Sequence, residues 1–435
     1  MRFTADDLAA ATGGRRTGPK VTVEGVAIDS RSDVRGRLFV PVVAAQDGHR
    51  FIPDALAGGA TAYLTQQVPA GGTAIEVDDT VRALADIGLA ARRRLPGRII
   101  GITGSVGKTT VKDLLAAVLA VRHRVVAASE RSFNNELGVP LTLANAPDDA
   151  EAVVVEMGAR GVGHIRALCA IARPTIGIVT AVGHGHTEYF GTKEDVARGK
   201  GELVEALPAD GFAVLNADDP LVRAMASRTK ATVVLVGLHG ADVTAEAVSL
   251  DDDLRASFVL RTPSGATPVH LAVRGAHQVG NALAAAGGAL SLGLTPEEVA
   301  EGLGVATSSP WRMQLLRTRG GATVLNDAYN ANPLSMAAAL RALAALPARR
   351  RIAVMGTMAE LGAVAEAEHA RAAALAAELG VRVIAVDEPR YGGEVAGDID
   401  EAVEALGPLG EGDAVLVKGS RVAGLERLAE RLAGQ

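Results

Sequence analysis

The chain has 435 residues, a formal net charge of −6 at pH 7 and one cysteine. Its length suffices for several domains with their own cores. The single cysteine excludes an intramolecular disulfide framework and fits a reducing compartment, while interspersed acids and bases disfavour a nucleic-acid surface. No apolar run approaches the roughly 20 residues of a membrane-spanning helix, so we expect a cytoplasmic α/β enzyme without nucleic-acid partners or membrane insertion.

Residues 1–97 predict a small α/β domain. Short apolar runs at 21–28, 38–43, 60–64 and 74–77 predict strands, and 81–95 predicts a helix. Three arginines and Pro96 close this segment, so we expect a domain boundary near residue 97. Asp29, Ser30 and Arg31, taken alone, are typical of a turn with a local salt bridge.

The stretch 98–119 predicts a strand, a glycine-rich turn and a helix. Residues 99–102 form a short apolar run, and residues 103–107 contain two glycines. From Val111 on, apolar residues recur with helical spacing. In such a turn, the backbone N–H groups at the helix N-terminus can bind a phosphate, and Gly104 and Gly107 let the backbone approach it. Lys108 can then reach the β and γ phosphates, and the Thr109 hydroxyl can bind Mg²⁺.

The spacing of this turn departs from the G-x-x-x-x-G-K-[ST] pattern. That pattern would place a glycine at 102, where the chain has Ile102. An ordinary glycine-rich strand–helix turn is the alternative. Because strand and helix flank the turn in the required order, we interpret it as a nucleotide-phosphate loop.

Further candidates follow within 98–312. Glu156 ends a predicted strand, where an acid can reach a metal beside the phosphates, although a solvent-exposed strand end is the alternative. His184 and His186 could bind a transition metal, but no clear third ligand accompanies them, and Mg²⁺ prefers oxygen donors. Lys200 lies fourteen residues after His186 on a predicted helix, 193–207, and alone is typical of a surface lysine.

The rest of the chain predicts a β-rich insert at 243–273, an Ala-rich helix opened by 275–281, and a helix start at Thr295 with Glu298 as its capping partner. A hinge is expected at 308–312. Residues 313–435 restart an α/β alternation, with strands at 323–325, 352–355, 381–386 and 414–417, helices from 335 and 368, and a last helix opening at 418–421. This pattern predicts a small doubly wound domain with polar loops at the strand carboxyl ends.

The ordered set of motifs resembles the Mur ligases of peptidoglycan precursor synthesis over nearly the whole chain. The segments that carry the resemblance are Asp29–Arg31, Asp47–His49, Thr103–Thr110 with its tight spacing, Phe133–Glu136, Glu156–Gly158, Asn326–Pro333, Gly356–Gly362 and Lys418–Arg421. The motif at 326–333 is most similar to that of members that add D-alanyl-D-alanine.

The resemblance implies three domains: an α/β domain binding the UDP substrate (1–97), a central P-loop parallel sheet with a β-rich insert (98–312), and a Rossmann-like domain for the incoming dipeptide and part of ATP (313–435). It implies an ATP-dependent, ADP-forming ligase, monomeric and using Mg²⁺. This enzyme would join D-alanyl-D-alanine to UDP-N-acetylmuramoyl-tripeptide through an acyl phosphate.

The resemblance also implies roles for individual residues. The catalytic set is Lys108, Lys200, His186 and Arg312. ATP contacts are Thr103, Gly104, Ser105, Gly107, Lys108, Thr109, Thr110, Asn281, Arg312 and Asp327. Substrate contacts are Ser30, Arg31, Asp47, Gly48, His49, Asn134, Asn135, Tyr329, Asn330, Asn332 and Lys418. The metal set is Thr109, Glu156, His186 and Lys200, the last as a carbamylated lysine, which turns an ammonium into an anionic oxygen donor.

The chain departs from the family pattern at His164, Asn326, Ala328 and Thr357, which affects local substrate contacts. Two alternatives stay open. One is a sibling Mur ligase, or a folylpolyglutamate synthase, that adds a single amino acid. The hypothesis of a folate enzyme would have to explain the presence of the first 97 residues. The other is a nucleotide-dependent switch without ligase chemistry. The third tripeptide residue, lysine or diaminopimelate, also stays open.

Overall fold

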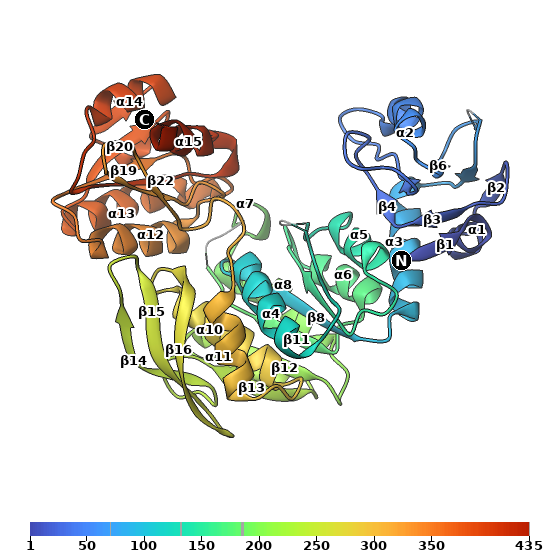
Figure 1. The fold of residues 1–435 in the computed structure, drawn as a ribbon, viewed down its shortest axis with the longest axis horizontal. Coiled ribbons are helices and arrows are strands. Elements are labelled where there is room, and N and C mark those ends of the chain that lie inside the picture. Colours follow the sequence, from blue (N-terminus) through green and yellow to red (C-terminus); the bar gives the residue numbers. More distant parts are fainter. Residues whose placement is uncertain (70, 131–132, 184–186, 435) are drawn as a thin grey trace.

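The computed structural model describes residues 1–69, 71–130, 133–183 and 187–434. Three α/β bodies follow one another along the chain, and the central body lies between the other two (Figure 1). This arrangement confirms the predicted fold class, whereas the boundaries at 97 and 312 stay predictions. Within the described ranges, no helix combines the length and apolarity needed to cross a membrane.

The N-terminal body contains a five-stranded sheet in the order β2-β7-β6-β5-β4 and an antiparallel pair, β1 with β3. Its elements are β1 (Arg2–Thr4), α1 (Ala5–Thr12), β2 (Arg15–Thr17), β3 (Thr22–Glu24), β4 (Val26–Ala27), β5 (Leu38–Phe39), α2 (Ile52–Ala57), β6 (Ala62–Thr65), β7 (Ala74–Glu76) and α3 (Thr80–Arg94). The strand predicted at 38–43 ends at Phe39, because Pro41 has no N–H for the ladder.

The central body is built on a fully parallel six-stranded sheet in the order β13-β12-β11-β8-β10-β9. Its elements before the insert are β8 (Arg98–Thr103), α4 (Lys108–Arg122), β9 (Val126–Ala128), α5 (Gly138–Asn145), β10 (Ala152–Glu156), α6 (His164–Ala172), β11 (Ile176–Val179), α7 (Thr187–Phe190), α8 (Lys193–Glu205), β12 (Phe212–Asn216), α9 (Pro220–Arg223) and β13 (Thr232–Val236).

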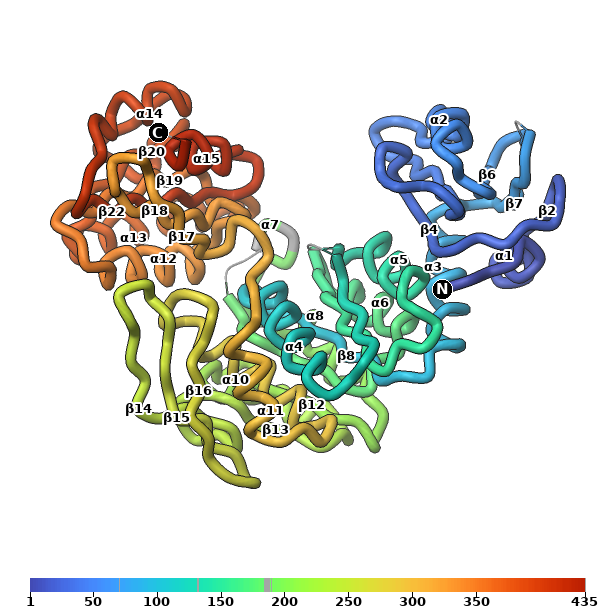
Figure 2. Tube along the Cα trace, viewed as in Figure 1, coloured from blue at the N-terminus to red at the C-terminus, as the bar shows by residue number. Residues whose placement is uncertain are grey.

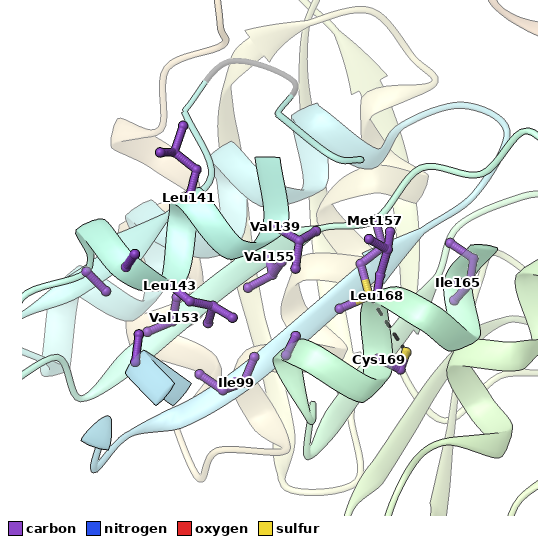
Figure 3. Close-up of a cluster of buried hydrophobic side chains, with 14 of the residues drawn as sticks. Ile99, Val139, Leu141, Leu143, Val153, Val155, Met157, Ile165, Leu168 and Cys169 are labelled. Carbon is purple, nitrogen blue, oxygen red and sulfur yellow. Dashed lines mark hydrogen bonds between the residues drawn. The ribbon is translucent and has the colours of Figure 1, made fainter. Parts of the chain in front are cut away.

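Both faces of this sheet are covered, and successive residues of β8 alternate between them. Ile99 packs with α3, α5, α6 and α8, whereas Ile100 and Ile102 face α4 and the two helices after the insert. Figure 3 shows the face that Ile99 shares with α5 and α6. There the Cys169 Sγ of α6 lies 3.8 Å from the Sδ of Met157, the residue that follows β10. Burial inside β8 explains why position 102 is an isoleucine.

The predicted β-rich insert is an antiparallel sheet of β14 (Thr244–Leu250), β15 (Arg255–Thr262) and β16 (Gly265–Arg274). It packs on α10 (Gln278–Leu290) and α11 (Pro296–Val305) in the same core cluster as α4. The capping box predicted for α11 is present, since the Thr295 hydroxyl accepts a hydrogen bond from the Glu298 N–H and the Glu298 side chain accepts one from the Thr295 N–H.

The C-terminal body has a six-stranded sheet in the order β17-β18-β22-β19-β20-β21, parallel except for β17. Its elements are β17 (Gln314–Arg317), β18 (Thr323–Asn326), α12 (Pro333–Ala345), β19 (Arg350–Met355), α13 (Ala365–Glu378), β20 (Arg382–Val386), β21 (Glu394–Ala396), α14 (Ile399–Leu406), β22 (Asp413–Lys418) and α15 (Glu426–Gly434). Helices α12 and α13 cover one face, and α14 and α15 cover the other.

The prediction that the last helix opens at 418–421 is wrong. A short 3₁₀ turn, Arg421–Ala423, comes first and ends at Gly424 in the left-handed conformation, with φ of 62°. Helix α15 therefore begins only at Glu426. The chain reaches this body through the connection between α11 and β17, which Figure 2 traces.

Gly302 permits the close crossing of α11 over α4. A Cβ added there would lie 2.4 Å from the Val118 Cα and 2.9 Å from its nitrogen, so the two helices would have to separate. We expect Gly302→Ala to lower the free energy of unfolding by about 1–3 kcal/mol, measured by urea unfolding. Gly304→Ala in the same helix is the control, because its nearest neighbour would be 3.5 Å away. Equal unfolding midpoints for the two variants would contradict the expectation.

Candidate active site

The glycine-rich turn between β8 and α4 is shaped by two close approaches. Gly104 has φ of 152°, and a Cβ there would lie 1.9 Å from the Thr180 Oγ1. Gly107 has φ of 83°, and its Cβ would lie 2.4 Å from the Asn281 Oδ1. Neither position tolerates a side chain, so glycine is required at both for the turn to pack against Thr180 and Asn281. In the described part of the chain, no side chain caps α4, so its N-terminal N–H groups are available to an anion.

Lys108 opens α4 with its side chain folded back over the turn. Its Nζ donates a hydrogen bond to the Gly104 carbonyl at 2.8 Å. Burial lowers the pKa of the Lys108 ammonium, Glu156 opposes this shift, and Arg312 adds to it. Lys108 and Arg312 are therefore two cations close to each other, and such a pair favours the binding of a polyanion.

The Glu156 carboxylate joins three segments of the chain. The carboxylate is almost completely buried, and Thr109 and Asn134 donate hydrogen bonds to its two oxygens, each at 2.8 Å. The Arg312 Nη2 in turn donates to the Thr109 hydroxyl at 2.8 Å. A hydroxyl and a carboxylate are hard oxygen donors that suit Mg²⁺. The described residues contain no group of three or more His, Cys, Asp or Glu that could hold a metal, and His186 lies outside them.

Lys200 is buried, so the interpretation of an ordinary surface lysine is wrong. Its side chain lies within α8 and is 1% exposed. Burial and the nearby Lys108 hold the pKa of its amine well below the usual value. A neutral amine at this position is nucleophilic, which an ammonium is not.

The opposite wall of the site follows β18 in the C-terminal body. The buried Lys418 ammonium donates hydrogen bonds to the Asp327 carboxylate and, at 2.9 Å, to the Asn330 carbonyl. The Arg312 guanidinium carbon lies 4.2 Å from the centroid of the Tyr329 ring. Asn332 caps α12 by accepting a hydrogen bond from the Ser335 N–H. Lys418 therefore shapes the loop that presents Asp327, Tyr329 and Asn330.

A cleft of about 650 Å³ lies between these two walls. The predicted residues that line it are Ser105, Gly107, Lys108, Thr109, Thr110, Asn134, Asn135, Glu156, Asn281, Arg312, Asp327, Tyr329, Asn330, Asn332 and Lys418. Thr103, Gly104 and Lys200 are not among the lining residues. The buried Thr103 hydroxyl, for example, donates to the Met157 carbonyl at 2.9 Å. The cleft therefore brings together most of the ATP candidates and all the substrate candidates except those of the N-terminal body.

The N-terminal candidates lie elsewhere. Among the described residues, none before Ser105 lines the cleft, and the N-terminal body lies on the far side of the central body from the C-terminal one (Figure 1). This separates Ser30, Arg31, Asp47, Gly48 and His49 from the other candidates.

The local bonds of this N-terminal group have structural roles. Asp29 accepts hydrogen bonds from the Arg31 guanidinium at 2.9 and 2.7 Å, which lower the pKa of Asp29 to about 2. The buried His49 ring accepts a hydrogen bond from the Gln66 N–H at Nε2, so its Nδ1–H donates to Asp47 at 2.6 Å. His49 therefore positions the Asp47 turn.

The residues that line the cleft and were not predicted from the sequence include three with polar or charged side chains, Asn216, His277 and Arg160. Asn216 ends β12, His277 directly precedes α10, and Arg160 follows Glu156 in the loop after β10. Strand ends and helix starts at one edge of a parallel sheet are the signal that could have identified the first two, as it identified Glu156.

Comparison with known proteins gives the family. Residues 102–289 match the model of the Mur ligase middle domain, and residues 311–421 match that of the Mur ligase, glutamate ligase domain. A UDP-N-acetylmuramoyl-tripeptide–D-alanyl-D-alanine ligase of Mycobacterium tuberculosis is 41% identical, over 94% of this chain and 91% of the relative.

Two solved structures are similar along nearly the whole chain. A crystal structure of MurF from Acinetobacter baumannii has a TM-score of 0.90 at 28% identity, covering 100% of this chain and 99% of that chain. MurF ligase from Thermotoga maritima, in complex with ADP, has a TM-score of 0.84 at 27% identity, covering 94% and 97%. The resemblance inferred from the motifs is confirmed, and the chain belongs to the Mur ligase family.

Proposed function

We propose that the chain is an ATP-dependent, ADP-forming ligase that joins D-alanyl-D-alanine to UDP-N-acetylmuramoyl-tripeptide in peptidoglycan precursor synthesis. The observation that carries this proposal is the shared cleft. Lys108 of the phosphate loop and the 327–332 segment of the C-terminal body line it together, although 219 positions separate Lys108 from Asp327. The Mycobacterium tuberculosis relative bears the name of this ligase, and the Thermotoga maritima structure contains ADP.

The proposed reaction has two steps. A free carboxylate is a poor acyl donor, because its leaving group would be oxide. The terminal carboxylate of the tripeptide therefore attacks the γ-phosphorus of ATP, and ADP leaves from an acyl phosphate. The amine of D-alanyl-D-alanine then attacks the acyl carbon, phosphate leaves, and the nitrogen loses a proton. Lys108 and Arg312 stabilise the negative charge on the transferring phosphoryl group.

The oxygen donors of the site fit magnesium. Thr109 and Glu156 would hold the ion, with His186 and a carbamylated Lys200 as further ligands. When bound, Mg²⁺ supplies charge neutralisation at the phosphates. The pKa of Lys200 supports the modification, because only the neutral amine adds to CO₂. The carbamate that forms is an anionic oxygen donor.

In this proposal, each of the three bodies binds a different substrate. Residues 1–97 bind the UDP moiety, 98–312 bind ATP, and 313–435 bind the dipeptide and part of ATP. We further propose that the protein acts as a cytoplasmic monomer. The cations Lys108, Arg160 and Arg312 beside the cleft support the binding of polyanionic nucleotides.

The choice of amine tests the function. With ATP, Mg²⁺ and UDP-N-acetylmuramoyl-tripeptide present, ADP and the pentapeptide product should form when D-alanyl-D-alanine is added, measured by coupled ADP release and product mass spectrometry. Single amino acids, glutamate among them, should not replace the dipeptide. ADP formation with a single amino acid but not with the dipeptide would favour the sibling ligase or folate enzyme, and nucleotide binding without a covalent product would favour a switch.

Lys108→Ala tests the phosphate loop. Removing a cation that acts on the transferring phosphoryl group should lower kcat by at least about 100-fold. Circular dichroism should be unchanged, because Lys108 contacts the turn through a single carbonyl. The exposed Lys230→Ala is the control and should match the wild type. Near-normal turnover of Lys108→Ala would remove the assignment of this loop.

Lys200→Ala tests the proposed carbamate. Loss of a metal ligand should lower kcat by at least about tenfold, and bicarbonate or a short carboxylate should partly restore it by filling the vacated space. Lys193→Ala, at the start of the same helix, is the control. A mass spectrum of the native protein that lacks the added CO₂ under saturating bicarbonate, together with no rescue, would contradict the modification.

A further inference from the structure

The connection between α11 and β17 is bound to the phosphate-loop helix at two points. The Ser309 N–H and hydroxyl both donate to the Asp113 carboxylate, at 2.8 and 2.7 Å. Three residues later, Arg312 donates to the Thr109 hydroxyl at 2.8 Å. Thr109 and Asp113 lie one turn apart on the same face of α4. The connection, which Figure 2 traces, therefore follows that helix.

Asp113 is suited to holding this connection in place. Its side chain is 13% exposed, and its second oxygen lies 2.8 Å from the Nζ of Lys112, which is 6% exposed. The carboxylate is thus compensated by a buried cation on one side and accepts two hydrogen bonds from Ser309 on the other. A carboxylate with three donors is held in one orientation, and Ser309 is held with it.

The backbone after Ser309 needs such support. Trp311 has φ of 58° and Met313 has φ of 49°, so both residues that flank Arg312 adopt the left-handed conformation, which is unfavourable for L-residues. On the C-terminal side, the Tyr329 N–H donates to the Trp311 carbonyl at 3.2 Å, and the Met313 N–H donates to Asp327 at 3.1 Å. The only bonds described from residues 308–312 to α4 are those of Ser309 and Arg312.

We propose that Asp113 is a positioning residue for Arg312. By binding Ser309, it fixes the start of the strained connection on α4 and so holds the Arg312 guanidinium at Thr109. This inference rests on the proposed function, in which Arg312 stabilises the transferring phosphoryl group. Without the Asp113 contact, the connection can relax its two left-handed residues, and the guanidinium moves away from the phosphate loop.

A double-mutant cycle tests the proposal. We expect Arg312→Ala to lower kcat about 100-fold and Asp113→Ala about tenfold, with the KM for the UDP substrate unchanged. The double variant should be no slower than Arg312→Ala within about twofold, because Asp113 acts through Arg312. Multiplication of the two effects, to about 1000-fold, would overturn the proposal, since a residue with a separate structural role behaves in that way.

A second pair of variants decides the matter if Asp113→Ala fails to fold by circular dichroism and thermal melting. Ser309→Ala removes one of the two bonds to Asp113 and should lower kcat about threefold. Ser308→Ala is the matched control, because its hydroxyl has no hydrogen-bond partner among the described residues. Equal kcat values for these two variants would overturn the proposal.

Nucleotide affinity separates this inference from the function on which it rests. If the wild type forms no ADP with any amine, the proposed function fails. The same cycle is then measured on the affinity for ATP by calorimetry, where Arg312→Ala and Asp113→Ala should again be non-additive. Additive losses of affinity would overturn the role of Asp113 independently of the reaction.

Discussion

The Glu156 carboxylate imposes the constraint on which the candidate site depends. A carboxylate that is 1% exposed loses its hydration and has to regain hydrogen bonds inside the protein. Thr109 supplies one from the phosphate-loop helix, and Asn134 supplies another from the segment before α5. Since Thr109 also accepts a bond from Arg312, one buried charge orders the loop, its helix and the connection to the next body.

Parallel sheets explain why the two walls of the cleft are polar. In the central sheet, β8, β10 and β12 end at the same edge and deliver the phosphate loop, Glu156 and Asn216 there. In the C-terminal sheet, β18 and β22 pair in parallel, with Asn326 opposite Val417. Asp327 follows Asn326, and Lys418 follows Val417, so the two residues lie next to each other. Their ion pair therefore follows from the register of β18 with β22. The cleft lies where these two strand edges face each other.

The features that sequence predicts well in this chain are local. The strand, turn and helix of 98–122 and the capping box at Thr295 depend on neighbouring residues, and both are present. The burial of Lys200 depends on the packing of α8 against the sheet, so the residue alone indicates a surface lysine, and only the family resemblance singled it out. The Ser309–Asp113 contact spans 196 positions and has no local signal. Helix α5, which lacks a side-chain cap, also gave no boundary signal and was not predicted.

The single cysteine has a practical consequence for measuring the distance between the N-terminal and C-terminal bodies. Cys169 is 4% exposed, and burial, with Glu202 acting in the same direction, raises the pKa of its thiol to about 12. At neutral pH almost no reactive thiolate is present, and reagents cannot reach the sulfur. Thiol-directed fluorophores should therefore not label the natural chain. A pair of cysteines introduced on the surfaces of the N-terminal and C-terminal bodies would report their separation by energy transfer, without removal of the native residue from its core.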